Sequence, residues 1–117
     1  MNKSLVGLFA ALVFLGLSTG LCAAELRGRL WETGKTGVPP GTLVQVTCQG
    51  ENPRPNEPVA NNGSYSVRGL PPERGCQLTV TTGGVTSRPV PFNTTRSVVS
   101  FNAEVRNYQG IILVLPR

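Results

Sequence analysis

Few side chains of this 117-residue chain are suited to catalysis or metal binding. The sequence has no histidine and no aspartate, and its six acidic residues are glutamates at positions 25, 32, 51, 57, 73 and 104. Nucleophilic catalysis by a Ser-His-Asp or Cys-His arrangement and zinc binding by histidine require the missing residue types. The glutamates form no close pair in sequence, so a two-carboxylate glycosidase site would depend on how the chain folds. We therefore expect no enzymatic activity, no metal site and no cofactor.

The first 24 residues have the pattern of a bacterial secretory signal peptide. Lys3 supplies a positive charge, residues 5–17 form an apolar run, and small residues surround the expected cleavage site after Ala24. The apolar run is shorter than the roughly 20 residues that a membrane-spanning helix needs. We expect a mature chain of residues 25–117 in the periplasm or outside the cell, which meets a membrane only through its signal peptide.

Three cysteines are present, and their positions suggest one disulfide. Cys22 lies within the expected signal peptide, and the alternative of a lipoprotein attached through Cys22 is disfavoured by the large residue Leu21 before it. Cys48 and Cys76 remain in the mature chain, and an even pair in an exported protein is typical of a disulfide. In the chain-entropy model such a bond contributes about 3–4 kcal/mol to stability. Two separate buried thiols are the alternative.

Basic and aromatic residues alternate with leucines near the start of the expected mature chain. Arg27, Arg29 and Trp31 would lie on one face of a strand, opposite Leu26 and Leu30. This face is our candidate binding surface for an anionic polymer, a glycan or an acidic partner. The simpler interpretation, which we favour, is an edge strand that is protected from pairing by its charges.

The net charge of +5 does not by itself indicate a nucleic-acid-binding protein. The arginines are scattered along the chain, whereas a nucleic-acid surface gathers basic residues with interleaved aromatic residues. An exported protein would also not meet nucleic acid. We expect the partner to be another envelope or secreted protein, or a surface polymer.

Seven segments of alternating hydrophobicity predict the strands that position these residues. They are residues 25–31, 42–49, 64–68, 76–81, 85–92, 97–105 and 111–115. In the second of them, for example, Val44, Val46 and Cys48 share one face. Glycines and prolines mark the turns, and no segment outside the signal peptide has helical periodicity. We predict an all-β fold, a seven-stranded antiparallel β-sandwich of immunoglobulin-like or transthyretin-like type, in one domain over residues 25–117.

Prolines and apolar runs suggest where some segments lie in the sheets. Residues 50–58 carry three prolines, which favours a rigid connection over a central strand. The segment 85–92 is interrupted by prolines and is expected at a sheet edge. Residues 111–115 are apolar on both faces, so we expect a central core strand, with a strand that pairs with another chain as the alternative.

The region from Leu26 to Val80 resembles the carboxypeptidase regulatory-like, or transthyretin-like (prealbumin-like), sandwich domains. The resemblance rests on the segments LRGRL, GTLVQV, NGSYSVRGLPP and QLTV, and the third has a G-x-Y-x-x-x-x-L-P signature. In that signature Gly63 would close a turn, Tyr65 would supply a core side chain and Leu70 would end the core before the prolines. The resemblance covers about half of the expected mature chain.

Domains of this kind usually act as binding, spacer or stabilising modules, and the resemblance implies such a role here. The related hydroxyisourate hydrolases are enzymes whose site depends on histidines, which this chain lacks. We therefore expect a small exported, non-catalytic accessory protein of the bacterial envelope that binds a protein or a surface polymer. The alternative is a structural subunit of an extracellular assembly, joined to its neighbours by strand addition through residues 111–115.

Overall fold

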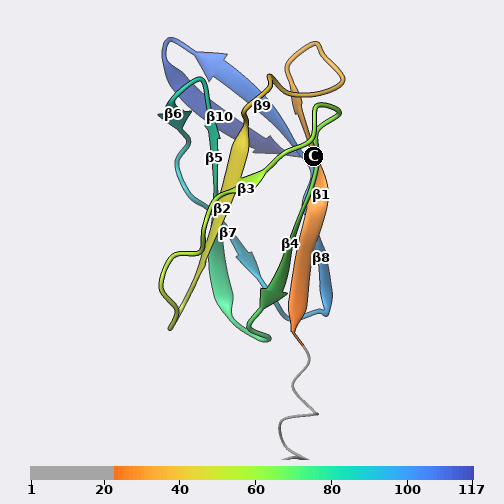
Figure 1. Ribbon diagram of the computed structural model, residues 1–117, viewed down its shortest axis with the longest axis vertical. Coiled ribbons are helices and arrows are strands. Elements are labelled where there is room, and N and C mark those ends of the chain that lie inside the picture. The colour runs from red at the N-terminus through yellow and green to blue at the C-terminus, as the bar shows by residue number, and fades with distance from the viewer. Residues whose placement is uncertain (1–22) are drawn as a thin grey trace, which may run out of the picture.

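The computed structural model describes residues 23–117, which form ten strands and no helix. The strands are β1 (Ala24–Glu32), β2 (Leu43–Cys48), β3 (Glu57–Pro58), β4 (Ser64–Leu70), β5 (Gly75–Thr82), β6 (Val85–Thr86), β7 (Val90–Asn93), β8 (Val98–Ser100), β9 (Ala103–Tyr108) and β10 (Ile111–Pro116). They form two sheets packed face to face, so the predicted β-sandwich is confirmed (Figure 1). Within these residues no helix is long and apolar enough to cross a membrane. The predicted signal peptide, including Cys22, lies outside the described residues except for Ala23 and Ala24.

The first sheet has β1 in its interior. Its strand order is β10-β9-β1-β4, and β8 also pairs with β1. β4 runs antiparallel to β1, whereas β8 and β9 both run parallel to it. The prediction of a wholly antiparallel sandwich is therefore wrong at these two pairs. Parallel neighbours need a long crossover between them, and all strands of the second sheet lie between β1 and β8 in the sequence.

The second sheet is antiparallel throughout. Its strand order is β3-β2-β5-β6, and β7 also pairs with β5. The predicted strand 85–92 is interrupted and forms β6 and β7, both at an edge of this sheet, as its prolines indicated. The proline-rich segment 50–58 is mostly a connection, and its last two residues form β3 at the opposite edge.

The predicted strand 97–105 is divided into β8 and β9 by Phe101 and Asn102. β1 pairs with β8 up to Arg27 and with β9 from Leu30 onward. Between them, the N–H of Phe101 donates to the carbonyl of Arg27 at 3.0 Å, and the N–H of Arg29 donates to the Asn102 side chain at 2.9 Å. This break divides the outer face of the first sheet into two parts. We call them the β8 half, with β8, the first part of β1 and β4, and the β9 half, with β9, β10 and the last part of β1.

Tyr65 supports the break from inside the sandwich. It lies opposite Gly28 in the β1–β4 pair, and its hydroxyl donates to the Phe101 carbonyl at 2.7 Å. A Cβ atom at position 28 would come within 1.9 Å of that same carbonyl oxygen, so the close approach requires glycine. Burial raises the pKa of Tyr65, which keeps its hydroxyl protonated as a donor.

The core is built from alternate residues of both sheets, as the periodicity predicted. Leu26 and Leu30 of β1, Val44 and Val46 of β2, and Leu78 and Val80 of β5 are almost fully buried. The intervening residues of the same strands are half-buried or exposed.

The interpretation of residues 111–115 as a central core strand is wrong. β10 lies at the end of the first sheet and pairs with β9 alone. Its central inward-facing residue Ile112 is buried, whereas Ile111 and Leu113 point outward and are exposed. Because β10 has a sheet neighbour on one side and solvent on its outer face, its apolar outer residues are left uncovered.

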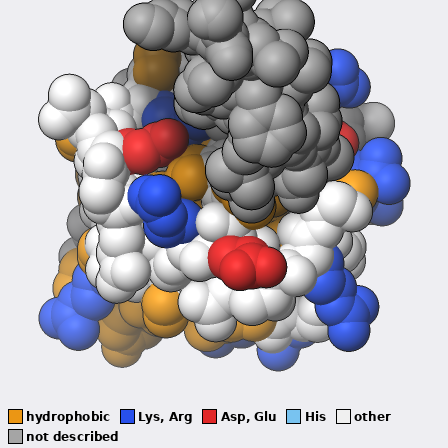
Figure 2. Space-filling model, turned by 90° about the horizontal axis from the view of Figure 1, so that it is seen from below, with side chains coloured by type: hydrophobic (Ala, Val, Ile, Leu, Met, Phe, Trp, Pro, Cys, Tyr) orange, Lys and Arg blue, Asp and Glu red, His pale blue; other side chains and the backbone are white. Residues whose placement is uncertain are grey.

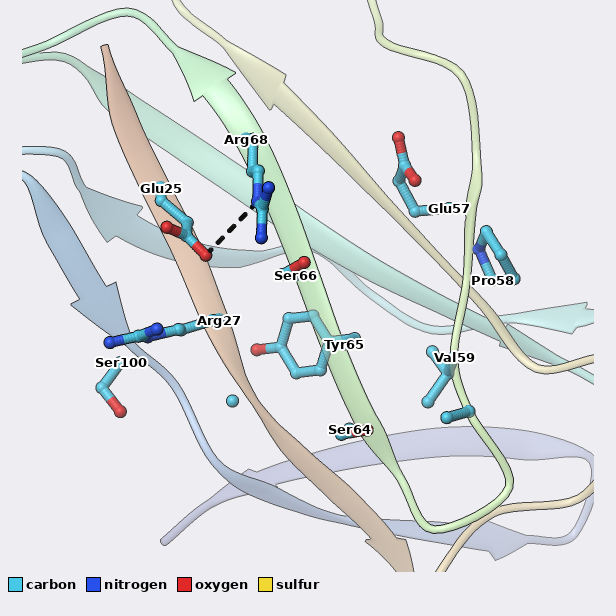
Figure 3. A pocket seen from close by; sticks show the side chains of 12 residues that line it. Glu25, Arg27, Glu57, Pro58, Val59, Ser64, Tyr65, Ser66, Arg68 and Ser100 are labelled. Atoms are coloured by element: carbon cyan, nitrogen blue, oxygen red, sulfur yellow. Dashed lines mark ion pairs between the residues drawn. The ribbon is translucent and has the colours of Figure 1, made fainter. Parts of the chain in front are cut away.

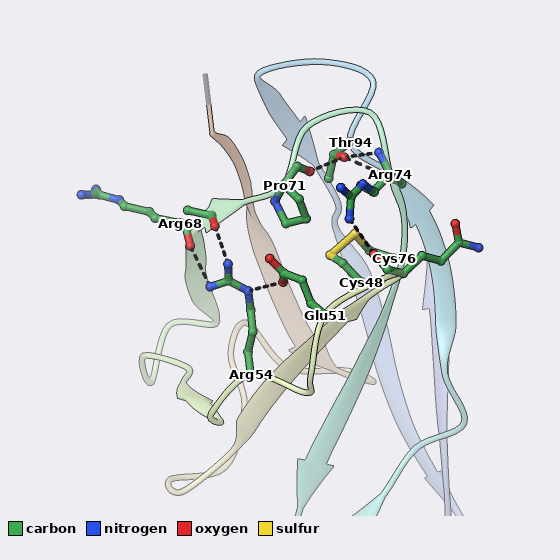
Figure 4. Close-up of a disulfide and its surroundings, with 10 residues drawn as sticks. Cys48, Glu51, Arg54, Arg68, Pro71, Arg74, Cys76 and Thr94 are labelled. Carbon is green, nitrogen blue, oxygen red and sulfur yellow. Dashed lines mark hydrogen bonds and ion pairs between the residues drawn. A yellow bond between two sulfur atoms is a disulfide. The ribbon is translucent and has the colours of Figure 1, made fainter. Parts of the chain in front are cut away.

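Cys48 and Cys76 form the predicted disulfide (Figure 4). The two residues are directly opposite each other on β2 and β5, so the bond joins neighbouring strands of the second sheet and does not cross the core. The bond lies at the end of β2, where the proline-rich segment begins.

That segment covers the outer edge of β4. The Arg54 guanidinium donates to the carbonyl of Arg68 at 3.3 Å and to the carbonyl of Gly69 (Figure 4). The N–H of Ala60 donates to the carbonyl of Ser64 at 3.0 Å. Backbone groups at both ends of β4 are therefore already bonded within the molecule.

Candidate functional site

The predicted basic and aromatic face of β1 is present on the outside of the first sheet. Arg27 and Arg29 are exposed and Trp31 is half-buried, while Leu26 and Leu30 on the opposite face are fully buried. The interpretation of this segment as a charged edge strand is wrong, because β1 has hydrogen-bonded neighbours on both sides. The charges on β1 therefore need another explanation than edge protection.

Arg29 has a structural role. Its Nε donates to the carbonyl of Asn62 at 3.0 Å, and its Nη2 donates to the carbonyl of Thr36 at 2.7 Å. The side chain thereby holds the glycine-rich turn after β1 against the turn before β4. A guanidinium with two backbone acceptors is fixed in place and has fewer donors left for a partner.

Arg27 lies in a groove on the β8 half (Figure 3). Its register neighbours are Ser66 on β4 and Ser100 on β8, one on each side. Within residues 23–117 the Arg27 side chain has no ion pair and no hydrogen bond. Two other charged residues from the first sheet line the groove: the guanidinium of Arg68 lies 3.8 Å from the carboxylate of Glu25.

Trp31 belongs to the β9 half, where its register neighbour is Glu104. The Glu104 carboxylate accepts hydrogen bonds from the Thr33 hydroxyl at 2.5 Å, from Arg117 at 2.6 Å and from Arg106 at 3.1 Å. The hydrogen bond from Thr33, followed by those from Arg117 and Arg106, lowers the pKa of Glu104 from 4.5 to about 2. This carboxylate is thus ionised and occupied by three donors.

Tyr108, Ile111 and Leu113 form an exposed apolar patch on the β9 half. Their exposed fractions are 57%, 52% and 37%. In the described part of the chain, Val98 of β8 is the only other large hydrophobic residue classed as exposed, at 40%. A single exposed hydrophobic residue such as Val98 is ordinary, whereas a contiguous group marks an interaction surface.

The β9–β10 hairpin makes this apolar patch continuous. Ile111 lies opposite Tyr108, and Leu113 lies opposite Arg106. The turn Gln109–Gly110 has positive φ at both residues, 54° and 81°, as in the type I′ turns that suit the twist of a hairpin. Arg106 borders the patch opposite Leu113, and its side chain is about half exposed.

The remaining charges do not gather into a site. Figure 2 shows one end of the sandwich, where Lys and Arg side chains are spread over the view and form no single cluster. Among residues 23–117 no group of three or more Cys or Glu side chains is placed to hold a metal ion.

No known protein family, curated protein or solved structure matches this chain. The assignment of a site therefore rests on the geometry. Of the three predicted residues, Arg27 lines the groove, Arg29 fixes two turns and Trp31 adjoins the Glu104 cluster. The apolar patch was not predicted from the sequence, although two features of the sequence indicate it: the apolar outer positions of residues 111–115 and the turn that precedes them.

Proposed function

We propose that this protein is a small exported, non-catalytic accessory protein that binds another protein through the apolar patch. The observation that carries the proposal is the cluster of Tyr108, Ile111 and Leu113, exposed side by side on one hairpin. Protein interfaces place aromatic and aliphatic anchors at their centre and polar groups around them. The patch has this composition, with Arg106 at its border.

The border suggests the chemistry of the partner. The Arg106 guanidinium lies beside the patch, and the Glu104 carboxylate accepts hydrogen bonds from both Arg106 and Arg117. The partner surface we propose is apolar at its centre and carries carboxylates at its rim. Packing two copies patch to patch would bring like charges together, so a different protein is favoured over a second copy.

Export to the periplasm or beyond the cell is part of the proposal. Its support is the signal-peptide pattern of residues 1–24 together with the Cys48–Cys76 disulfide, a bond that persists in oxidising compartments. The absence of histidine and aspartate from the whole sequence supports a non-catalytic role. Kinship with the transthyretin-like domains also remains a proposal, and the structural role of Tyr65 in the shared signature is consistent with it.

Strand addition through residues 111–115 has less support than binding through the face. β10 lies next to β5 and β6 of the second sheet, and Ile112 is only 2% exposed, main chain included. The middle of the strand is therefore covered on the side where an added strand would have to bind. The outer faces of Ile111 and Leu113 are free of this obstruction.

The variant Leu113→Lys tests the proposal, with Val98→Lys as its matched control. Both replace an exposed hydrophobic residue of the first sheet by lysine, and both should leave stability within about 0.5 kcal/mol of the unmodified protein. Leu113→Lys should weaken binding of the partner by about 2 kcal/mol, or about 30-fold, because it places a charge among the anchors.

The measurement is affinity capture from envelope extracts followed by titration of the captured protein. A partner held by the unmodified protein and by Val98→Lys, and lost by Leu113→Lys, supports the proposal. Equal binding by the two lysine variants would show that the apolar patch is not the contact surface.

A further inference from the structure

The groove on the β8 half is separate from the apolar patch and has a different lining. Its volume is about 800 Å³, within the range of ordinary ligand sites. Three serines, at positions 64, 66 and 100, line it together with Glu57 and the Glu25–Arg68 pair (Figure 3). Pro58, Val59 and Tyr65 also line it, so the groove combines hydrogen-bonding groups with apolar surface.

Arg27 is the cation of this groove that has no ion pair within residues 23–117, and Glu57, at the far side of the lining, is the anion without one. Glu25 is paired with Arg68 at 3.8 Å, and no described residue pairs with Arg27. Hydroxyl groups stand on both sides of it, from Ser66 and Ser100 on the adjacent strands. A guanidinium binds a carboxylate through two parallel hydrogen bonds, and neighbouring hydroxyls can bond to what that carboxylate is attached to.

We propose that this groove binds an acidic glycan, with the carboxylate of a sugar acid at Arg27 and sugar hydroxyls on the serines and Glu57. Among the described residues, the combination of an unpaired guanidinium with several hydroxyl and carboxylate groups matches a ligand that carries a carboxylate and is rich in hydroxyls. An extended acidic peptide fits less well. It would pair with free backbone groups at the edge of the sheet, and Arg54 already occupies the carbonyls of Arg68 and Gly69 at the edge of β4. The inference is independent of the proposed protein-binding function, since it rests on the other half of the sheet.

The test is a titration of the purified protein, expressed from its full coding sequence, with defined probes. Calorimetry and NMR measure the binding of each probe. The probes are an oligomer of galacturonic acid, a neutral glucose oligomer of the same length, free galacturonate and hexaglutamate. We expect the galacturonate oligomer to bind most tightly and to shift the signals of Arg27, Ser66 and Ser100. We expect its affinity to fall as salt is raised, because the contact at Arg27 is ionic.

The variant Arg27→Gln removes the charge and keeps a polar side chain, and Arg88→Gln is its control at another exposed arginine. Arg27→Gln should weaken binding of the galacturonate oligomer at least about tenfold, as expected for a charged hydrogen bond, and Arg88→Gln should not. Ser100→Ala is a second variant and should weaken binding by a smaller factor.

Three results would overturn the inference: no binding of the galacturonate oligomer, equal binding of the neutral oligomer, or equal losses in the two glutamine variants. Equal or tighter binding of hexaglutamate would assign the groove to acidic peptides instead. Tight binding of free galacturonate alone would mark it as a small-molecule site. The variant Leu113→Lys should bind the glycan normally, so the two proposals stand or fall separately.

Discussion

The two halves of the outer face of the first sheet differ sharply in chemistry although they share the strand β1. The β8 half is a polar groove around Arg27, flanked by serines of the neighbouring strands. The β9 half presents the exposed side chains of Tyr108, Ile111 and Leu113 and, farther along the hairpin, the ionised carboxylate of Glu104. The change occurs where Phe101 and Asn102 interrupt pairing with β1.

This contrast shows how a short irregularity diversifies one sheet face. In an unbroken strand, every second residue points to the same face, and the pairing with the neighbouring strand keeps one register. Here the interruption lets one chain segment supply two separate partners for β1, each with its own surroundings. One sheet face of a small domain thereby carries two surfaces of different chemistry.

The largest expected effect comes from the disulfide of the second sheet, which belongs to neither half. Replacing Cys48 and Cys76 by alanine together should lower the free energy of unfolding by about 3–4 kcal/mol, because the unfolded chain gains freedom. Urea unfolding measures this loss, and NMR spectra should show both halves of the outer face unchanged in the folded state. A change confined to one half would mean that the disulfide positions that half specifically.

A smaller loss is expected from Gly28→Ala, which acts at the boundary between the halves. The added methyl group would meet the Phe101 carbonyl at 1.9 Å, and the resulting backbone shift should cost about 1–3 kcal/mol. Gly75→Ala is the control, since a Cβ there makes only ordinary contacts and its φ is not positive. If both variants were equally stable in thermal unfolding, the close crossing at Gly28 would not be needed for the break.

The smallest effect depends on pH and is confined to the β9 half. The pKa of Glu104 is about 2 in the folded protein and about 4.5 in the absence of its partners. Its ionised form therefore stabilises the fold above pH 4.5, and this contribution is lost as the pH falls from about 4.5 to about 2.

Urea midpoints at pH 6 and pH 2.5 check this for the unmodified protein and for Glu104→Gln. The variant should be less stable at pH 6, and the difference should shrink at pH 2.5. In the unmodified protein the NMR signals of Thr33 and Arg117 should move near pH 2, where the Glu104 carboxylate of the folded protein takes up its proton, while those of Ser100 stay constant. A difference in stability that is the same at both pH values would contradict the role given to Glu104.

The inward and outward faces of the strands were predictable from local periodicity. Alternation alone predicts that Leu26 and Leu30 face inward while Arg27 and Arg29 face outward. It also predicts inward positions for Cys48 and Cys76. Alternation states which residues share a face, and burial of apolar surface then decides which face is inside.

The neighbours of each strand were not predictable in the same way. Nothing in the period of β1 distinguishes an edge strand from one with parallel neighbours on one side, because the pairing is set by the path of the whole chain. The partners of Glu104 show the same limit: Thr33 lies 71 residues away in sequence and Arg117 lies 13 away. Residues 111–115 are apolar on both faces, which favoured a strand buried on both faces. A strand with one covered face needs only alternate apolar residues, so the extra apolar residues of β10 were misleading.

The position of β1 between three other strands has a mechanical consequence. Backbone hydrogen bonds link it to β4 on one side and to β8 and β9 on the other, along nearly its whole length. A pull on residue 24 along the axis of the strand would load these bonds in shear, so that many must break together instead of opening one after another. Leu26 and Leu30 would have to leave the core in the same step. The fold is therefore built to resist tension applied at the start of β1.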